Sequence, residues 1–253
     1  MRSLPLIVIF LLTLALVLLA VEVGYQLGLV RQRSANREKE APVGAMVGAT
    51  LGLLAFLLAF TFGLGANFFA QKREVLLNEA NAIGTTWLRT AFLSPDDRDT
   101  ARVLLREYVD IRLAAVESGE VEGAMQRSEE IHSALWALAT EAINDEPRSV
   151  AAGLFVETLN DTIDLHAKRV QVALRTRIPP TIWYALYAIS FFAFGTLGYL
   201  SGLGSANRSY ATIAVGIIFS GVIWLIADLD TAAEGTLRIS QQTMIDLRNT
   251  MEP

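Results

Sequence analysis

Hydrophobic residues in this chain gather into long unbroken runs instead of recurring singly at regular spacing. A run of about 20 apolar residues is long enough to cross a lipid bilayer as a helix. Runs of this kind occupy residues 4–30, 43–69, 181–203 and 210–227. The pattern therefore predicts a polytopic, multi-pass membrane protein with four transmembrane helices.

Between the second and third runs, apolar residues recur at three- and four-residue spacing, which is typical of amphipathic helices. Ser94 and Pro95 have the residue types of a helix N-cap and first helical position. Gly119, Gly123 and Pro147 punctuate the pattern. No strand-like alternation occurs, so we expect an all-α protein whose middle region is a bundle of helices.

The predicted organisation has four parts. Residues 1–70 hold the first two spans, 71–178 the soluble bundle, 179–227 a transmembrane hairpin, and 228–253 a polar C-terminal tail that becomes helical past Gly235. No turn residue separates the apolar end of the second span from the charged segment after it. We therefore predict one helix from about Val43 to about Leu88.

The distribution of charged residues predicts how the chain is oriented in the membrane. Residues 71–178 carry 13 basic and 18 acidic side chains, so the net charge of −5 lies in this region and no basic nucleic-acid face is visible. The basic residues that flank the spans favour a cytoplasmic bundle and cytoplasmic termini, although the short loop 31–39 on the other side is also basic. A signal peptide at the N-terminus is the alternative to a retained first span, but the apolar run is longer than signal peptides need.

The sequence gives little support for a catalytic or metal-binding site. The chain has no cysteine, which excludes disulfides, thiolate metal sites and cysteine nucleophiles. His132 ends a single Glu-x-x-His, but di-iron bundles need a second one and His166 does not supply it. We expect both histidines to be solvated or interhelical side chains. Asp228, Asp230 and Glu234 offer oxygen ligands for Ca²⁺, but without EF-hand spacing an acidic cap on the tail is favoured.

Enzyme motifs are also missing from the sequence. It contains no phosphate-binding loop, no zinc-protease motif and no nucleophile elbow. We therefore expect no enzyme activity, no cofactor and no metal ion.

The second span separates into three faces when its residues are placed at 100° per residue. One face holds the small residues Gly44, Gly48, Gly52, Ala59 and Gly63, a bulky stripe beside it holds Phe56, Phe60, Leu64 and Asn67, and the third holds Val47, Leu51, Leu54, Leu57, Leu58, Phe68 and Phe69. Small residues at every fourth position let membrane helices approach closely. We expect the small face to contact another helix, within the chain or between copies, and the third face to contact lipid.

The bulky stripe raises two alternatives. If copies of this helix pack around an axis through their small faces, Phe56, Phe60 and Leu64 form hydrophobic rings that end in a ring of Asn67. Such a constriction gates ions by wetting and dewetting, and the positive edges of aromatic rings tolerate a passing anion. Alternatively, Phe56 and Phe60 belong to the core of a four-span bundle.

Two segments carry a family resemblance: "QKREVLLNEANAIGTTWLR" at residues 71–89 and "DLDTAAEGTLRIS" at residues 228–240. They resemble the bacterial family of unknown function known as bestrophin-like, and the resemblance extends over nearly the whole chain from about Val43. The motif positions are Arg73, Glu79, Asn81, Gly84, Asp228, Asp230 and Gly235. Thr231-Ala232-Ala233 replaces the proline-containing turn of relatives, which bears on whether the tail folds back as theirs does.

This resemblance implies a pore. Bestrophins, to which the family is distantly similar, are pentameric anion channels with a neck of bulky residues one turn apart on the second span, and Phe56 and Phe60 match that spacing. Lys72, Arg73 and Arg89 would favour anions near the membrane exit, whereas the acidic middle region counts against them.

The prediction is a homo-oligomeric channel, a pentamer in a bacterial inner membrane, whose partners are its own copies, the lipid bilayer and a small inorganic anion. The alternative is a non-conducting membrane scaffold or sensor whose helical bundle binds a partner protein.

Overall fold

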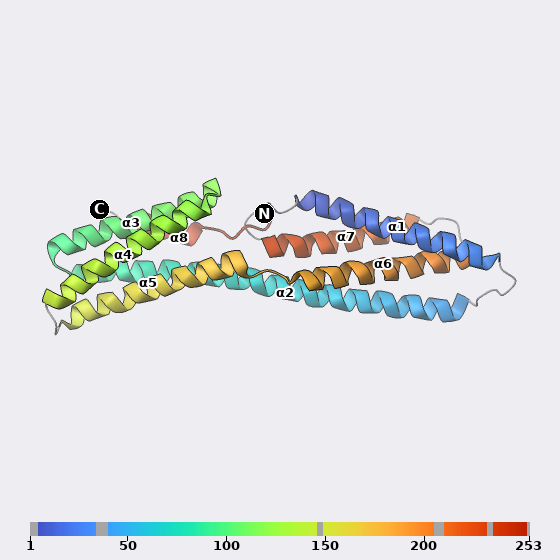
Figure 1. Cartoon of the computed structure of the whole chain (residues 1–253), viewed down its shortest axis with the longest axis horizontal. Coiled ribbons are helices and arrows are strands. Elements are labelled where there is room, and N and C mark those ends of the chain that lie inside the picture. Colours follow the sequence, from blue (N-terminus) through green and yellow to red (C-terminus); the bar gives the residue numbers. More distant parts are fainter. Residues whose placement is uncertain (1–4, 34–39, 146–148, 205–209, 232–234, 252–253) are drawn as a thin grey trace. The chain divides into compact units, whose positions relative to one another are not determined.

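The structure is a computed structural model that describes residues 5–33, 40–145, 149–204, 210–231 and 235–251. Every regular element in these residues is a helix and none is a strand (Figure 1), which confirms the predicted all-α class. Among the described helices, four are long and apolar enough to cross a membrane. They are α1 (Leu6–Gln32), α2 (Glu40–Arg89), α6 (Pro180–Leu203) and α7 (Tyr210–Thr231).

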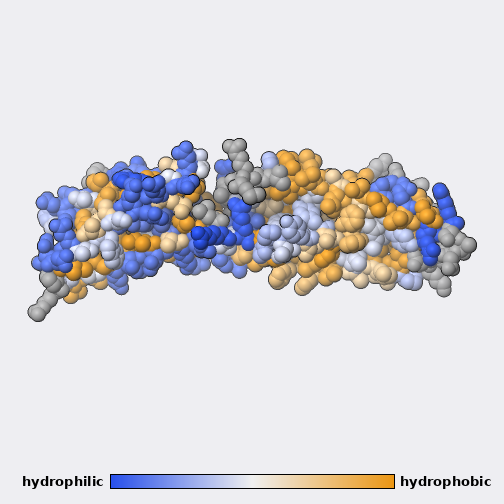
Figure 2. Space-filling model, viewed as in Figure 1, coloured by the Kyte–Doolittle hydropathy of each residue, from blue (hydrophilic) through white to orange (hydrophobic). Residues whose placement is uncertain are grey.

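The chain divides into two compact units. The first comprises Met1–Phe69 and Arg177–Arg238, and the second comprises Ala70–Thr176 and Ile239–Pro253. Hydrophobic side chains dominate the visible surface of the first unit and hydrophilic ones that of the second (Figure 2). Because the first unit ends at Arg238 and the second resumes at Ile239, the segment after the last span belongs partly to each unit.

Helix α2 is unbroken from Glu40 to Arg89, which confirms the predicted single helix. Its only proline, Pro42, lies in the first turn, where no intrahelical bond is lost. A short 3₁₀ turn (Thr90–Phe92) follows, and Leu93 adopts an extended conformation that ends the helical run. The helix supplies residues to both units.

Helices α1 and α6 of the first unit approach so closely that only glycine fits at several positions. A Cβ atom on Gly24 would lie 1.9 Å from the carbonyl oxygen of Gly195, and one on Gly198 would lie 2.1 Å from that of Val21. Small residues permit such backbone contact between membrane helices. The sequence predicts close packing on α2 and misses this contact, although Gly24 and Gly28 have the same four-residue spacing.

The second unit is a helical bundle. It is built from the polar half of α2 with α3 (Pro95–Ser118), α4 (Val121–Asp145), α5 (Val150–Arg175) and α8 (Gln242–Thr250). Ser94 caps α3 as predicted, because its hydroxyl accepts a first-turn N–H at 3.3 Å and Pro95 follows it. Gly119 ends α3 with φ 76°, a left-handed conformation that suits glycine. Gly123 lies inside α4, and Pro147 lies outside the described residues.

The core of this bundle contains large side chains from five helices. They include Ile83, Leu105, Tyr108, Ile131, Leu135, Phe155, Leu159 and Met244. Met244 and Met251 are both fully buried, so the end of the predicted polar tail is part of the core. Helix formation in the tail resumes at Gln242.

Candidate functional site

One face of α2 is exposed along nearly the whole helix. The positions at its centre follow the helical period and are Ala45, Ala49, Gly52, Phe56, Phe60, Gly63, Asn67, Ala70, Glu74, Leu77, Asn81, Thr85 and Leu88. Phe56 is 65 % exposed and Phe60 is 61 % exposed. The alternative that these phenylalanines form the core of the four-span bundle is therefore wrong for the single chain.

Leu64 differs from the other predicted neck residues. Its side chain is half-buried and packs against the core of the first unit, whereas Asn67 is exposed. Leu53, one turn before Phe56, is 50 % exposed. The bulky part of the exposed face thus centres on Phe56 and Phe60, with Leu64 at its margin.

The small residues of α2 face open space in the single chain. A Cβ atom on Gly48, Gly52 or Gly63 would have no neighbour within 4 Å, and Ala59 is also exposed. Gly44 has only the side chain of Leu200 at 3.9 Å. Within the described part of the chain nothing packs on the three open glycines, and contact of this face with another copy stays a prediction.

The third face of α2 corrects an expectation. Val47, Leu54 and Leu58 are buried, and Leu51, Leu57 and Phe68 pack against the same core, so this face is not the lipid surface as predicted. Periodicity separates faces but does not say which one turns inward. Large aliphatic side chains make many more contacts than glycine, so dispersion favours burying them.

A buried carboxylate joins three helices of the second unit. Glu79 lies in the polar half of α2, beyond the apolar run, and its side chain is 0 % exposed. It accepts hydrogen bonds from the Tyr108 hydroxyl at 2.6 Å and from the Arg169 guanidinium, and the Nε atom of Arg112 lies 3.5 Å away. Glu79 thus pairs with arginines of two other helices, α3 and α5. Arg73 remains exposed.

The neighbours of Glu79 decide its charge. Burial alone would raise its pKa, but the guanidinium groups of Arg169 and Arg112, with hydrogen bonds from Arg169 and Tyr108, hold that pKa below its usual value. Burial and the Glu79 carboxylate raise the pKa of Tyr108. Its hydroxyl therefore stays protonated and donates a hydrogen bond to Glu79. The cluster is a structural ion pair network that fixes α2, α3 and α5 together.

Both histidines lie beside this network. His132 and His166 are each 6 % exposed, their rings are 4.9 Å apart, and Nδ1 of His166 lies 2.9 Å from the Tyr108 hydroxyl. Burial lowers the pKa of each imidazole to about 4, so both are neutral at pH 7. They are interhelical, and the solvated alternative is wrong. Among the described residues, no three metal-ligating side chains gather into a candidate site.

The turn after α7 is built on a buried aspartate. Asp228 accepts hydrogen bonds from the Thr236 N–H at 2.7 Å, from the Leu237 N–H at 3.2 Å and from the Thr236 hydroxyl. A Cβ atom on Gly235 would fall 1.8 Å from the Asp228 carboxylate, so only glycine fits. The tail therefore folds back despite its changed turn sequence.

This geometry gives the proposed Ca²⁺ ligands another role. The carboxylate of Asp228 is engaged by the turn, and that of Asp230 accepts the Ile178 N–H at 2.8 Å. Glu234, Ala232 and Ala233 lie outside the described residues. Asp228 and Asp230 act as caps, because they accept hydrogen bonds from backbone donors that would otherwise be buried without partners.

Two further motif residues lie on the polar half of α2. A Cβ atom on Gly84 would lie 3.2 Å from the Leu247 side chain, so glycine here lets α8 pack tightly on α2. Asn81 is exposed at the centre of the α2 face. Gly84 therefore has a packing role, whereas Asn81 belongs to the exposed face.

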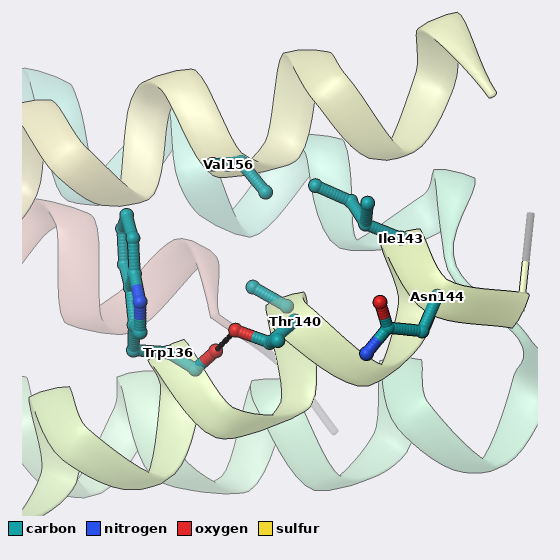
Figure 3. Close-up of a pocket in the computed structure, with 6 residues that line it drawn as sticks. Trp136, Thr140, Ile143, Asn144 and Val156 are labelled. Carbon is teal, nitrogen blue, oxygen red and sulfur yellow. Dashed lines mark hydrogen bonds between the residues drawn. The ribbon is translucent and has the colours of Figure 1, made fainter. Parts of the chain in front are cut away.

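A recess of about 100 Å³ lies between α4 and α5. Figure 3 shows Trp136, Thr140 and Asn144 on α4 with Val156 of α5 opposite them. Pockets for metabolites usually enclose about 300–1,000 Å³. The recess is too small for such a ligand. Trp136 at its edge is 43 % exposed.

The profile of the bestrophin-like domain matches residues 12–244 of the chain. The chain belongs to the bestrophin-like family. The Glu79 network, the Asp228 turn and the exposed α2 face of this bestrophin-like protein all lie inside the matched segment. The family predicted from the motif residues is thereby confirmed.

The fold of this bestrophin-like chain is similar to solved crystal structures. A variant of a bacterial bestrophin homologue from Klebsiella pneumoniae aligns with TM-score 0.68 at 14 % identity over 97 % of each chain. A second variant of that homologue gives TM-score 0.65 at 15 % identity, and a variant described as a membrane protein gives 0.68 at 14 %, again over 97 % of each chain. Identities this low show a shared fold. Curated protein sequences gave no match.

Proposed function

We propose that this protein is an ion channel in which copies of α2 surround a pore, assembled as a homo-oligomer, a pentamer, in a bacterial inner membrane. The observation that carries the proposal is the exposed pair Phe56 and Phe60, which lie one helical turn apart on the face of α2 that the chain leaves uncovered. The family resemblance described from the sequence implies a pore lined by this same helix.

The composition of the exposed face supports a pore more than a lipid surface. Asn67 continues the face after Phe60 and Gly63, and a polar side chain at this position suits a passage that holds water. Lipid contact explains the phenylalanines alone, whereas a pore that widens from an apolar neck into water explains Asn67 as well.

The small residues supply the assembly contact. Gly48 and Ala59 flank the phenylalanines on one side of the face, and a Cβ atom on Gly48 would have open space beside it. Two helices that meet through glycine approach closely enough for extensive van der Waals contact, which is the driving force for association in lipid. Contact through this flank turns the adjacent Phe56 and Phe60 toward a common axis.

Phe56 and Phe60 would then form the gate. An ion entering a ring of phenyl groups loses hydration that the apolar ring does not replace, so a narrow ring stays dewetted and closed. Movement that widens the ring lets water and ions pass. The hydrophobic ring acts on all small ions and does not by itself select their charge.

The basic residues behind the predicted anion preference lie off the centre of the exposed α2 face. Lys72 is buried, and Arg89 donates hydrogen bonds to the Leu154 carbonyl and to Glu157. Arg73 is exposed but lies off the centre of the face. The proposed function is therefore an ion channel without an assigned preference for anions.

The test is ion flux into liposomes that contain the purified protein, compared with the Phe56→Ala/Phe60→Ala double variant. The double variant should leak chloride or potassium faster than the wild type, because a wider, less apolar ring wets more easily. Its thermal stability should match the wild type, since neither side chain belongs to the core. A variant without flux and with a large loss of stability would favour the non-conducting scaffold, for which exposed Trp136 is the supporting observation.

A further inference from the structure

The centre of the exposed α2 face carries a single charged residue, Glu74. The 18 residues from Phe56 to Glu74 make about five turns at 3.6 residues per turn, so the two occupy the same angular position. The other central positions from Phe60 to Leu88, all of them described, are uncharged: Gly63, Asn67, Ala70, Leu77, Asn81 and Thr85. The only formal charge on this face after the neck is therefore negative.

The charge of Glu74 is not compensated within the described residues. Its side chain is exposed and has neither an ion pair nor a hydrogen bond there. The adjacent basic residues lie on other sides of the helix. Lys72 is buried on the far side, and Arg73 is exposed about 100° around the helix from Glu74.

We propose that Glu74 forms a ring of carboxylates that makes the pore prefer small inorganic cations. This inference rests on the proposed channel, because the ring exists only if copies of α2 surround one axis. Rings of acidic side chains are an established way to attract cations into a channel. A passage lined by one sign of charge also concentrates the opposite ion.

The ring and the neck have separate tasks. Glu74 follows Phe56 by about 27 Å along the helix at 1.5 Å per residue, several Debye lengths at physiological salt. Its field therefore acts on ions in the water-filled approach to the neck and not on the dewetted rings themselves. The phenylalanines open and close the pore, while the carboxylates of Glu74 determine which ions are concentrated at the approach to it.

The test is the K⁺/Cl⁻ permeability ratio, measured in planar bilayers under a KCl gradient for the wild type and in the Phe56→Ala/Phe60→Ala background. The wild type should favour K⁺, and Glu74→Gln should lower the ratio by roughly tenfold at low salt. Glu74→Asp should retain the preference, and Glu74→Lys should reverse it. Arg73→Gln is the matched control, an exposed charge one residue away but off the centre, and should leave the ratio unchanged.

Salt concentration separates a charged ring from a size effect. At about 1 M salt the Debye length is about 3 Å, so the difference between wild type and Glu74→Gln should shrink. Two results would overturn the role of Glu74 and leave the channel standing. In one, Glu74→Gln conducts with the same K⁺/Cl⁻ ratio as the wild type. In the other, Arg73→Gln shifts the ratio as much as Glu74→Gln does. Absence of flux from both wild type and the double alanine variant would overturn the channel, and the Glu74 ring with it.

Discussion

Tyr108 of α3 donates its hydroxyl to the carboxylate of Glu79 of α2 at 2.6 Å, and both side chains are 0 % exposed. Arg169 of α5 binds the same carboxylate. The polar half of α2 is thus held in its bundle by a charge that water does not reach. The helix that carries the proposed neck continues into this anchored segment without a break.

The first prediction concerns this anchor. Glu79→Gln should lower the free energy of unfolding by about 3–5 kcal/mol, because Arg112 and Arg169 would keep their buried charges without the carboxylate. Thermal or denaturant unfolding in detergent measures the loss. Glu117→Gln, an exposed site on α3, is the control and should change stability by less than about 0.5 kcal/mol. Equal stability of the two variants would show that the network contributes nothing.

The second prediction is a pH dependence. In the unfolded chain His132 and His166 bind protons near pH 6.5, but in the folded unit only near pH 4. Between these values the unfolded state holds more protons. The free energy of unfolding should therefore fall as the pH drops from 6.5 to 4, by up to about 1.4 kcal/mol per pH unit for each histidine.

The measurement is thermal unfolding at about pH 7 and about pH 5 for the wild type and for His132→Asn/His166→Asn. The double variant should lose less stability between the two pH values, whatever its stability at pH 7. Glu79, whose pKa is lowered, adds a loss of stability only below its ordinary value of 4.5, which is below the two pH values compared here. Identical pH slopes for both proteins would contradict the assignment to the histidines.

The third prediction contrasts two glycines in membrane helices. Gly198→Ala should destabilise the first unit by about 1–3 kcal/mol, because its Cβ atom would meet the Val21 carbonyl at 2.1 Å. Gly48→Ala should leave the fold unchanged, since its Cβ atom meets nothing within 4 Å. Thermal unfolding in detergent compares them. A larger loss for Gly48→Ala would show that α1 and α6 do not meet as described.

The fourth prediction addresses assembly. Gly48→Leu and Gly52→Leu should weaken the oligomer, because a bulky side chain prevents close approach at a face that is open in the single chain. Light scattering after size exclusion in mild detergent gives the oligomeric state. Wild-type protein that runs as a monomer would refute the assembly contact and the pore together.

The sequence predicts what depends on local pattern. The motif positions Glu79 and Gly235 come from the family resemblance. The four apolar runs, the unbroken α2 and the Ser94 cap follow from composition, periodicity and short-range chemistry. These features are decided by residues close together in the chain, so one sequence is enough to find them.

The remaining errors concern which surfaces meet. The leucine-rich face of α2 is core and not the expected lipid surface, and the glycine contact between α1 and α6 was not predicted. Helical periodicity describes a face without naming its partner, which is a choice among distant segments. For the same reason the burial of His132 beside His166 has no signal in the spacing of either residue.

The most direct test of the central claim uses the absence of cysteine from the chain. Phe56→Cys and Phe62→Cys place single thiols in the apolar half of α2, at native positions that are 65 % and 39 % exposed in the single chain. Phe62 lies about 120° around the helix from Phe56, so a pore would reach only Phe56. The smaller and more polar cysteine lets the ring at position 56 wet, so a charged thiol reagent should label Phe56→Cys in liposomes, change its ion flux and leave Phe62→Cys unmodified. Equal labelling at both positions, or at neither, would contradict a pore lined by this face of α2.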